Sequence, residues 1–598
     1  MVRRTEFHSS RPMGAIAASI ALLIALAADA GEIGVNDFRV SEMGPDGSVL
    51  FGGTQAAVAY NSTNDEFLIV WEGEDNTPPL VENENEIFGQ RIDAETGAAI
   101  GPRLRLSDMG PNGDPAYDAR SPAVAYNATQ NEYLVVWVGD DDTGLLLDGE
   151  DEIYGQRVDA ATGTEVGAND FRISDMGPDG ATGFDADVPD VAYSPTAGEY
   201  LVVWEADDDT GLLIEGENEI FVQRIDAATG TEVGANDLRV SDMGTDGDNT
   251  FDARDPAVAW SFTHNEYLVV WEADDNTGLL TDGENEIWGQ RIDATTGTEV
   301  GSNDFRISDM GPDANTTFDA RMPDVVFNVG VGEYLVVWEG DDDTPPLVGG
   351  EDEIFGQRID GATGGEVGSN DFRVSDMGPN GSDLYAAGQP AVAYDPVAGE
   401  YLVIWEADDD GSGLTEGEHE IFLQRLDSLG NETGVNDVRL TDLGAEGSPL
   451  YDAEVPALAY GASVGAFAIV FHGDDDRGGM VDEELEVFGQ LLWGDRLGVA
   501  VDGACPGTVE FAIASATPGG FVGLAGAPAV GSSTVPGGSC AGTELGLSNP
   551  IPIAGETADG GGGVTIELTV PAPICSAVVQ VLDLSSCEVS NVSLLPDA

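Results

Sequence analysis

A repeat of roughly 67 residues runs through most of the chain and limits what it can fold into. The phrase EIFGQR, or a close variant, returns with its glutamine at positions 90, 156, 223, 290, 357, 424 and 490. An aromatic residue closes the preceding apolar run with the same spacing: Trp71, Trp137, Trp204, Trp271, Trp338, Trp405 and Phe471. Self-similarity at a fixed period of this length indicates a repeat architecture. The chain therefore contains seven copies of one structural unit.

Each copy contains four short runs with strand character. In the third copy they are DVAYS from Asp190, EYLVVWEA from Glu199, EIFVQRID from Glu219 and DLRVSD from Asp237. The first two are nearly continuous apolar runs, as expected of strands buried on both faces, and the last two carry more polar residues. Four strands per repeat indicate the blade of a β-propeller. The predicted fold class is all-β, with a seven-bladed propeller.

The two ends of the repeat array complement each other. An FRVS strand occurs at Phe38–Ser41, before the first complete repeat, whereas the last repeat ends after EVFGQLLWGDRLG without one. We expect the N-terminal strand to complete the seventh blade, which closes the ring and removes exposed sheet edges. An open β-solenoid is the alternative, but it needs no such complementary truncation.

The N-terminal segment predicts export. Arg3, Arg4 and Arg11 precede an apolar run at 14–28, and Ala28-Asp29-Ala30 matches an A-x-A cleavage site. An apolar run of this length is short of the ~20 residues that span a bilayer. Residues 1–30 are therefore predicted to be a signal peptide cleaved near Ala30, 31–498 the propeller, and the mature protein secreted or at the cell surface.

The last hundred residues differ in composition and predict a second domain. Alternating stretches such as VTIELTV and SAVVQVLDL indicate a small β-sandwich at 499–598. All four cysteines lie here: Cys505, Cys540, Cys575 and Cys587. In an exported chain they predict two disulfides, and nearest-neighbour pairing gives Cys505–Cys540 and Cys575–Cys587, although three pairings are possible. Zinc is a weaker alternative because no C-x-x-C spacing is present.

The repeat sequence VVWE…EIFGQR…FRVSDMG resembles that of seven-bladed propeller repeat proteins exported by bacteria. The tail, through CPGTVEF, CAGTELGL and VQVLDLSSCEVSNV, resembles C-terminal domains of large secreted bacterial proteins. Together the two similarities cover nearly the whole mature chain. They imply a fold and a compartment but no particular reaction.

The charge of the chain excludes two classes of partner. It has 111 acidic residues against 22 basic ones, a net charge of −89, and every basic residue is arginine. Nucleic acid and anionic membrane surfaces would be repelled by such a field. Cations, carbohydrate and a cell-surface or matrix protein remain as partners, and we expect a monomer.

Most of the acids fall in loops that one face of a propeller would share, such as DDDTGLLIEGENEIF at 207–221. Carboxylate oxygens at this density suit calcium, although the segment does not fit an EF-hand. A solvated acidic face is the alternative, and the apolar LLI predicts a small cap over neighbouring loops. The predicted calcium ligands are Asp141, Asp142, Asp207, Asp208, Asp209, Asp274, Asp275, Asp341, Asp342, Asp408, Asp409, Asp474 and Asp475.

Two histidines break the sevenfold symmetry on this face. His419, in GEHEIF, and His472, in VFHGDDD, belong to adjacent repeats. With Asp474–Asp476 they could form a metal-assisted catalytic site, but an atypical last blade is also what ring closure would produce. We therefore assign no catalytic residue from the sequence.

The sequence thus favours an exported, non-enzymatic protein whose acidic face binds calcium and supports surface or matrix interactions. Two alternatives remain. One is a polysaccharide hydrolase or lyase that acts on the acidic face, and the other is a passive scaffold adapted to high salt.

Overall fold

A computed structural model describes residues 32–594 apart from short segments. The segments outside the description are 76–77, 79, 142–145, 209–211, 276–279, 343–346, 383, 410–413, 415–416, 445–446, 476–479, 482–483, 495–497, 504–505, 515–519, 529, 536–539, 541–543, 549, 559–563, 572–576 and 586–588. Within the described part of the chain no helix is long and apolar enough to cross a membrane.

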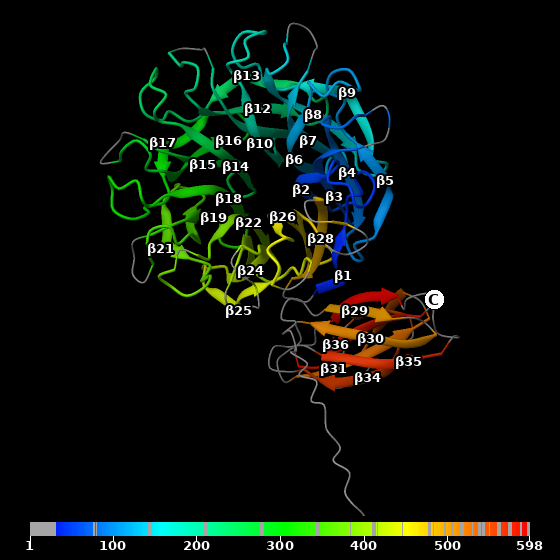
Figure 1. Cartoon of the computed structure of the whole chain (residues 1–598). Coiled ribbons are helices and arrows are strands. Elements are labelled where there is room, and N and C mark those ends of the chain that lie inside the picture. The colour runs from blue at the N-terminus through cyan, green and yellow to red at the C-terminus, as the bar shows by residue number, and fades with distance from the viewer. Residues whose placement is uncertain are drawn as a thin grey trace, which may run out of the picture.

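The first 28 strands form seven four-stranded antiparallel sheets arranged as the blades of a propeller (Figure 1). The innermost strand of each blade contacts the innermost strands of both neighbours, and blade 7 contacts blade 1, so the ring is closed. The predicted all-β propeller is confirmed.

The strands of each blade follow one another from the axis outward. Blade 1 has β2 (Gly53–Asn61), β3 (Glu66–Glu74), β4 (Asn85–Asp93) and β5 (Ala99–Arg105); blade 2 has β6 (Ala119–Asn127), β7 (Glu132–Asp140), β8 (Asp151–Asp159) and β9 (Thr164–Arg172). Blade 3 has β10 (Ala186–Ser194), β11 (Glu199–Ala206), β12 (Glu219–Asp226) and β13 (Glu232–Arg239); blade 4 has β14 (Ala253–Ser261), β15 (Glu266–Ala273), β16 (Glu286–Asp293) and β17 (Glu299–Arg306). Blade 5 has β18 (Ala320–Asn328), β19 (Glu333–Gly340), β20 (Glu353–Asp360) and β21 (Glu366–Arg373); blade 6 has β22 (Ala387–Asp395), β23 (Glu400–Ala407), β24 (Glu420–Asp427) and β25 (Glu432–Arg439). Blade 7 has β26 (Ala453–Gly461), β27 (Ala466–Gly473), β28 (Glu486–Trp493) and, outermost, β1 (Glu32–Arg39).

The N-terminal strand closes the ring. Strand β1 pairs antiparallel with β28, with Phe38 opposite Gly489 and Arg39 opposite Phe488. Blade 7 is thus built from both ends of the repeat array, as the complementary truncation predicts.

The apolar core lies between blades. The second strands are buried on both faces because each packs against two neighbouring sheets. Their tryptophans are fully buried: Trp71, Trp137, Trp204, Trp271, Trp338 and Trp405. One core cluster joins Val203 and Val222 of blade 3 to Val269 and Trp271 of blade 4. The continuous apolar runs in the sequence are explained by this packing.

A bulge near the start of every inner strand turns one residue toward the axis. These residues have positive φ without being glycine, at 46–51°: Gln55, Ser121, Val188, Asp255, Met322, Gln389 and Val455. A proline follows in every blade except blade 1, which has Ala56. The left-handed region is unfavourable for side chains, most of all for the β-branched valines, and backbone strain of this kind is concentrated at functional sites.

The C-terminal part contains three further sheets. One joins β29 (Gly498–Gly503), β30 (Gly507–Ala514) and β35 (Val564–Val570), another joins β34 (Ile551–Thr557), β31 (Phe521–Ala527), β36 (Val578–Asp583) and β37 (Val589–Leu594), and a third pairs β32 (Val530–Thr534) with β33 (Glu544–Leu547). Residues of the first two sheets, such as Phe511 and Val581, share one apolar core. Cys540 is disulfide-bonded, and the other three cysteines lie outside the described residues, so their pairing stays a prediction.

Candidate active site

The axis of the propeller holds a cavity of about 500 Å³. It is lined by six of the seven bulge residues and by the residue that follows each bulge, a proline except in blade 1: Gln55, Ala56, Ser121, Pro122, Val188, Pro189, Asp255, Pro256, Met322, Pro323, Gln389, Pro390 and Pro456. The bulges lie at the start of the inner strands, on the same side of the ring as the acidic loops. The cavity therefore opens toward the acidic face.

A glutamate from the preceding blade holds each strained bulge in most of the ring. The backbone N–H of Asp255 donates to Glu205 at 2.8 Å, and that of Val455 donates to Glu406 at 2.8 Å. The equivalent pairs are Ser121 with Glu72, Met322 with Glu272 and Gln389 with Glu339. These glutamates belong to the WE dipeptide at the end of the second strands. They form a ring of five carboxylates, interrupted by Val138 in blade 2 and by His472 in blade 7.

The ring departs from its repeat pattern most at blades 6 and 7. Across the first strand pair, Glu72 faces Thr54, Glu205 faces Asp187, Glu272 faces Arg254 and Glu339 faces Arg321. Glu406 faces Gly388 instead, and the nearest side chain of that strand is the amide of Gln389, 3.5 Å from Oε1. In blade 7, His472 takes the place of the glutamate and faces Glu454. No side chain therefore stands directly opposite Glu406, and the next blade supplies a second carboxylate.

His419, Glu454 and His472 form a cluster at this point. The Nδ1 atom of His419 lies 3.8 Å from Oε1 of Glu454, and Nε2 of His472 lies 3.7 Å from Oε2. Only 6% of His472 is exposed, whereas the side chains of His419 and Glu454 are 40% exposed. The Nδ1 atom of His472 is buried and has no hydrogen-bond partner among the described residues. The two predicted histidines are thus brought together by a carboxylate that the sequence analysis missed.

The environments of Glu406 and Glu454 push their pKa values apart. Contacts with His419 and then His472 lower the pKa of Glu454 well below its usual range, while the same carboxylate raises the pKa of His419 to about 9. Burial raises the pKa of Glu406, and the negative charge of Glu454 adds to that effect. At neutral pH, Glu454 is therefore ionised, and Glu406 holds its proton more strongly than an exposed glutamate does. Two carboxyl groups tuned in opposite directions are the usual equipment of acid–base catalysis.

The predicted calcium ligands have structural roles as hydrogen-bond acceptors. Asp207 accepts the backbone N–H groups of Gly216 at 2.6 Å and Asp185 at 3.0 Å, and Asp208 accepts that of Gly177 at 3.0 Å. The same roles are taken by Asp274, Asp341, Asp408 and Asp474 at the first position, and by Asp141, Asp275, Asp342, Asp409 and Asp475 at the second. Asp142 and Asp209 lie outside the described residues.

The apolar loop tips are divided between core and solvent. Only 8% of Leu213 is exposed, against 70% of Leu212 and 41% of Ile214. The fully buried Glu217 accepts backbone N–H groups from Ile214 at 3.1 Å and from Gly247 in the next loop at 3.0 Å. In this loop the predicted apolar cap therefore consists of a single buried leucine, Leu213. The buried carboxylate of Glu217 connects the loop to the adjacent one through hydrogen bonds.

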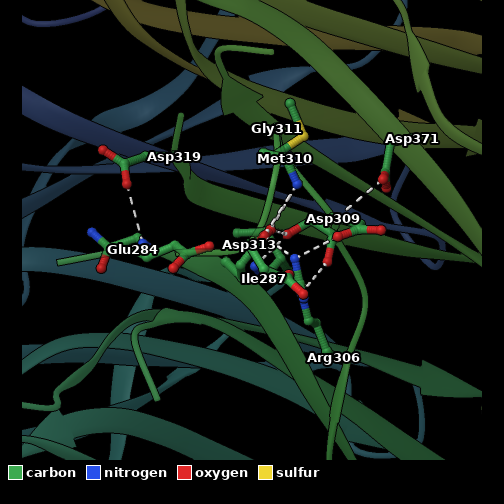
Figure 2. Close-up of polar contacts among 12 residues, drawn as sticks. Glu284, Ile287, Arg306, Asp309, Met310, Gly311, Asp313, Asp319 and Asp371 are labelled. Carbon is green, nitrogen blue, oxygen red and sulfur yellow. Dashed lines mark hydrogen bonds and ion pairs between the residues drawn. The ribbon is translucent and has the colours of Figure 1, made fainter. Parts of the chain in front are cut away.

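A second buried carboxylate lies deeper in each blade. In blade 4 the fully buried Glu286 contacts Arg306 and Ser308 and accepts the backbone N–H of Met310 at 3.1 Å. Figure 2 shows Arg306 and Met310 in this network, with Asp371 of the next blade reaching the N–H of Asp309 at 3.1 Å. The recurring arginines thus make cross-strand ion pairs, as Arg172 does with Glu152 and Arg373 with Glu353.

Burial raises the pKa of many of these carboxyls. It reaches about 7 for Glu286 and about 8 for Glu219. It reaches about 7 for the aspartates of the outer strands: Asp170, Asp237, Asp304, Asp371 and Asp437. Protons therefore reduce the repulsion among buried acids.

We expect the melting temperature to fall as the pH rises from 5 to 8. A carboxyl with a raised folded pKa keeps its proton between about pH 4.5 and 7, where the unfolded chain has lost it, so stability declines across this window. Thermal melts at constant ionic strength measure the slope. Asp304→Asn should flatten it, because asparagine tolerates the positive φ at that position and does not titrate. A melting temperature that rises from pH 5 to 8 would contradict the proposed role of burial.

Among the described residues, no group of three or more His, Cys, Asp and Glu side chains has an arrangement that could hold a metal ion. In blade 1, where the other blades have the outer-strand aspartate, Arg103 contacts Asp75 and the carbonyl of Glu42. The guanidinium group of Arg103 thus occupies the position that an aspartate takes in the other blades. Calcium binding stays a prediction.

The residues of the candidate site that the sequence analysis missed are Glu406, Glu454 and Gly388. Their signal was present in the repeat itself, because aligning the seven copies position by position shows where blades 6 and 7 depart. Glutamates occur so often in this chain that residue type alone could not distinguish them.

No protein-family model matches the chain, and no curated protein matches it. Several solved structures are similar in fold. An α-L-arabinofuranosidase from Fusarium graminearum has 12% identity and a TM-score of 0.38, over 77% of this chain and 98% of its own. An ulvan lyase of polysaccharide lyase family 25 has 9% identity and a TM-score of 0.43, over 78% and 95%.

An exo-β-1,3-galactanase from Phanerochaete chrysosporium has 11% identity and a TM-score of 0.30, over 94% and 97%. These similar proteins are all carbohydrate-active enzymes. The prediction of a non-enzymatic binding protein is corrected on this finding. The sequence had favoured a non-enzymatic protein because all seven repeats carry similar acidic loops, and a site present in only one or two blades is hard to distinguish among them.

Proposed function

We propose that the protein is an exported hydrolase that cleaves a neutral polysaccharide at the mouth of the central cavity, with Glu406 and Glu454 as its two catalytic carboxyl groups. The observation that carries the proposal is their placement. Glu406 faces Gly388 and accepts the N–H of Val455, and Glu454 lies directly before Val455 between two histidines. Most glycoside hydrolases use such a pair of Asp or Glu carboxyls.

The roles follow from the two environments. Glu406 donates its proton to the glycosidic oxygen as the bond to the anomeric carbon breaks, so the leaving sugar departs as a neutral alcohol. Glu454 acts on the other side of the bond, either by accepting a proton from the attacking water or by attacking the anomeric carbon itself. The anomeric configuration of the first product distinguishes these routes. His419 and His472 are positioning residues that keep Glu454 ionised.

Charge favours a neutral substrate over an anionic one. A lyase needs cationic groups to neutralise a uronate carboxylate, and the net charge of −89 repels such polymers. The three arginines that face the ring glutamates or lie at the equivalent position are themselves ion-paired. Arg120 pairs with Asp151, Arg254 with Asp252 and Arg321 with Asp319. Of the two reactions in the sequence-based alternative, hydrolysis is therefore the one proposed.

The remaining organisation belongs to the same proposal. Residues 31–498 form the catalytic propeller and 499–598 a β-sandwich that serves as a spacer or attachment domain after export. The shared core of the two larger C-terminal sheets supports this division.

The proposal is tested by incubating the purified full-length chain with arabinan, galactan and xylan and with polygalacturonate as the charged control. We expect new reducing ends from at least one neutral polymer and none from polygalacturonate. Unsaturated products absorbing in the ultraviolet would instead indicate a lyase. Absence of product from every neutral polymer across pH 5 to 8 would reject the hydrolase.

A further inference from the structure

The bulge residues that line the central cavity differ along the ring. Gln389 in blade 6 and Gln55 in blade 1 lie on either side of blade 7, which carries Glu454 and His472. Blades 3 and 4, opposite blade 7, contribute Val188 and Asp255. The amide side chains are thus placed on the side of the proposed catalytic pair.

We propose that this cavity is a subsite for one neutral sugar unit of the substrate, held by the side-chain amides of Gln55 and Gln389. The inference rests on the proposed hydrolase and deepens it by naming what is recognised beside the catalytic pair. The ligand is a polyhydroxyl ring without a charged group.

The backbone presents both glutamines to the cavity. Their φ values are +51° for Gln55 and +50° for Gln389, a conformation that residues other than glycine adopt only where the surroundings enforce it. The side-chain nitrogen of Gln389 lies 3.5 Å from Oε1 of Glu406, so the amide lies next to the proposed acid. The amide that would bind the sugar and the carboxyl that would protonate the glycosidic oxygen are therefore adjacent.

Blade 1 also widens the cavity beside Gln55. Six blades follow the bulge residue with proline, but blade 1 has Ala56, which lacks the ring. Alanine takes less room than proline in this part of the wall. The blade-7 residue that precedes blade 1 in the ring is His472 rather than a glutamate.

The lining matches the chemistry of a sugar. An amide donates and accepts hydrogen bonds, as a hydroxyl group does, and the pyrrolidine rings offer an apolar wall to the C–H face of the sugar. A volume of about 500 Å³ is within the usual range for small-ligand pockets, which combine mostly apolar walls with a few polar groups. A uronate carboxylate would meet the carboxylate of Asp255, and the described lining residues offer no cationic side chain to neutralise it. The site therefore selects against charged sugars.

Binding without turnover tests the subsite. Calorimetric titrations use the full chain with Glu454→Gln, neutral hexasaccharides of pentoses and of hexoses, and an oligogalacturonate of the same length. In that background, Gln55→Gly and Gln389→Gly remove the amides and tolerate the positive φ. Gln130→Gly is the matched control, because Gln130 is an exposed amide in the turn between β6 and β7, at the other end of the blade.

We expect a neutral hexasaccharide to bind, the double glycine variant to bind it at least ~10-fold more weakly at an unchanged melting temperature, and the control to bind normally. Binding that is unaffected by the double variant would overturn the subsite, as would equal binding of oligogalacturonate or no binding at all. If the subsite binds as expected but the wild-type chain cleaves no neutral polymer, the hydrolase fails and the sugar site stands. Cleavage that does not depend on the two glutamines overturns the subsite alone.

Discussion

The substitution Glu454→Gln should lower kcat/KM on the neutral polysaccharide by about 10³-fold, the usual contribution of a positioned acid or base. Glutamine keeps the size of the side chain but cannot accept a proton or attack carbon. The side chain of Glu454 is 40% exposed, so the fold should tolerate the change. Initial rates of reducing-sugar release measure the effect.

The chain offers a matched control for this variant. Asp187 occupies the position of Glu454 in blade 3 and faces Glu205 rather than a histidine. Asp187→Asn should leave kcat/KM within about twofold, because that blade lacks the histidine pair. Equal losses in both variants would show that a carboxylate ring, and not one site, supports activity.

The histidines allow a sharper readout. His419→Ala and His472→Ala remove the contacts that lower the pKa of Glu454, so the acidic limb of the pH–rate profile should move to higher pH. A role in packing alone would lower the rate without moving that limb. If activity and its pH profile both survive the double change, this assignment of the site is wrong.

The second large effect concerns stability. Arg306→Met should lower the free energy of unfolding by about 3 kcal/mol, because it leaves the fully buried Glu286 without its cation. Urea denaturation at pH 8 measures it. At pH 5 the loss should shrink, since burial raises the pKa of Glu286 to about 7 and the protonated acid no longer needs the charge.

A control comes from blade 4 as well. Arg254 pairs with Asp252 at 2.6 Å, but half of its side chain is exposed. Arg254→Met should therefore cost less than about 1 kcal/mol at either pH. A loss at Arg306 that is equally small, or that does not change with pH, would mean that the buried carboxylates are stabilised without their arginines.

The fold was predictable because its signal is repeated. Seven copies of one pattern average out local ambiguity, and the missing outer strand of blade 7 could be matched to Phe38–Ser41 by counting alone. The function of the acids was not predictable in the same way. Asp207 and Glu217 have the residue types of solvent-exposed loops, but the tight turns between blades leave backbone N–H groups that require buried acceptors.

The candidate site was predicted in part. Repeat position placed His419 and His472 on the same face of adjacent blades, and the structure brings both to one carboxylate. Glu454 was missed because the residue that it faces depends on the strand register, which the sequence does not give. Gly388 was missed because its lack of a side chain stands out only when the seven copies are aligned and the other six carry a side chain at that position. Departures from a repeat, not the repeat, indicate where function lies.

The pairing of β1 with β28 sets the order in which the molecule can become active. The strand that finishes blade 7 precedes every other propeller strand in the chain, while Glu454 and His472 lie more than four hundred residues later. The proposed catalytic pair is therefore assembled at the seam of the ring, and a truncated or unclosed chain has no intact seam. Activity on polysaccharide would then require that β1 has paired with β28 and that the ring is closed.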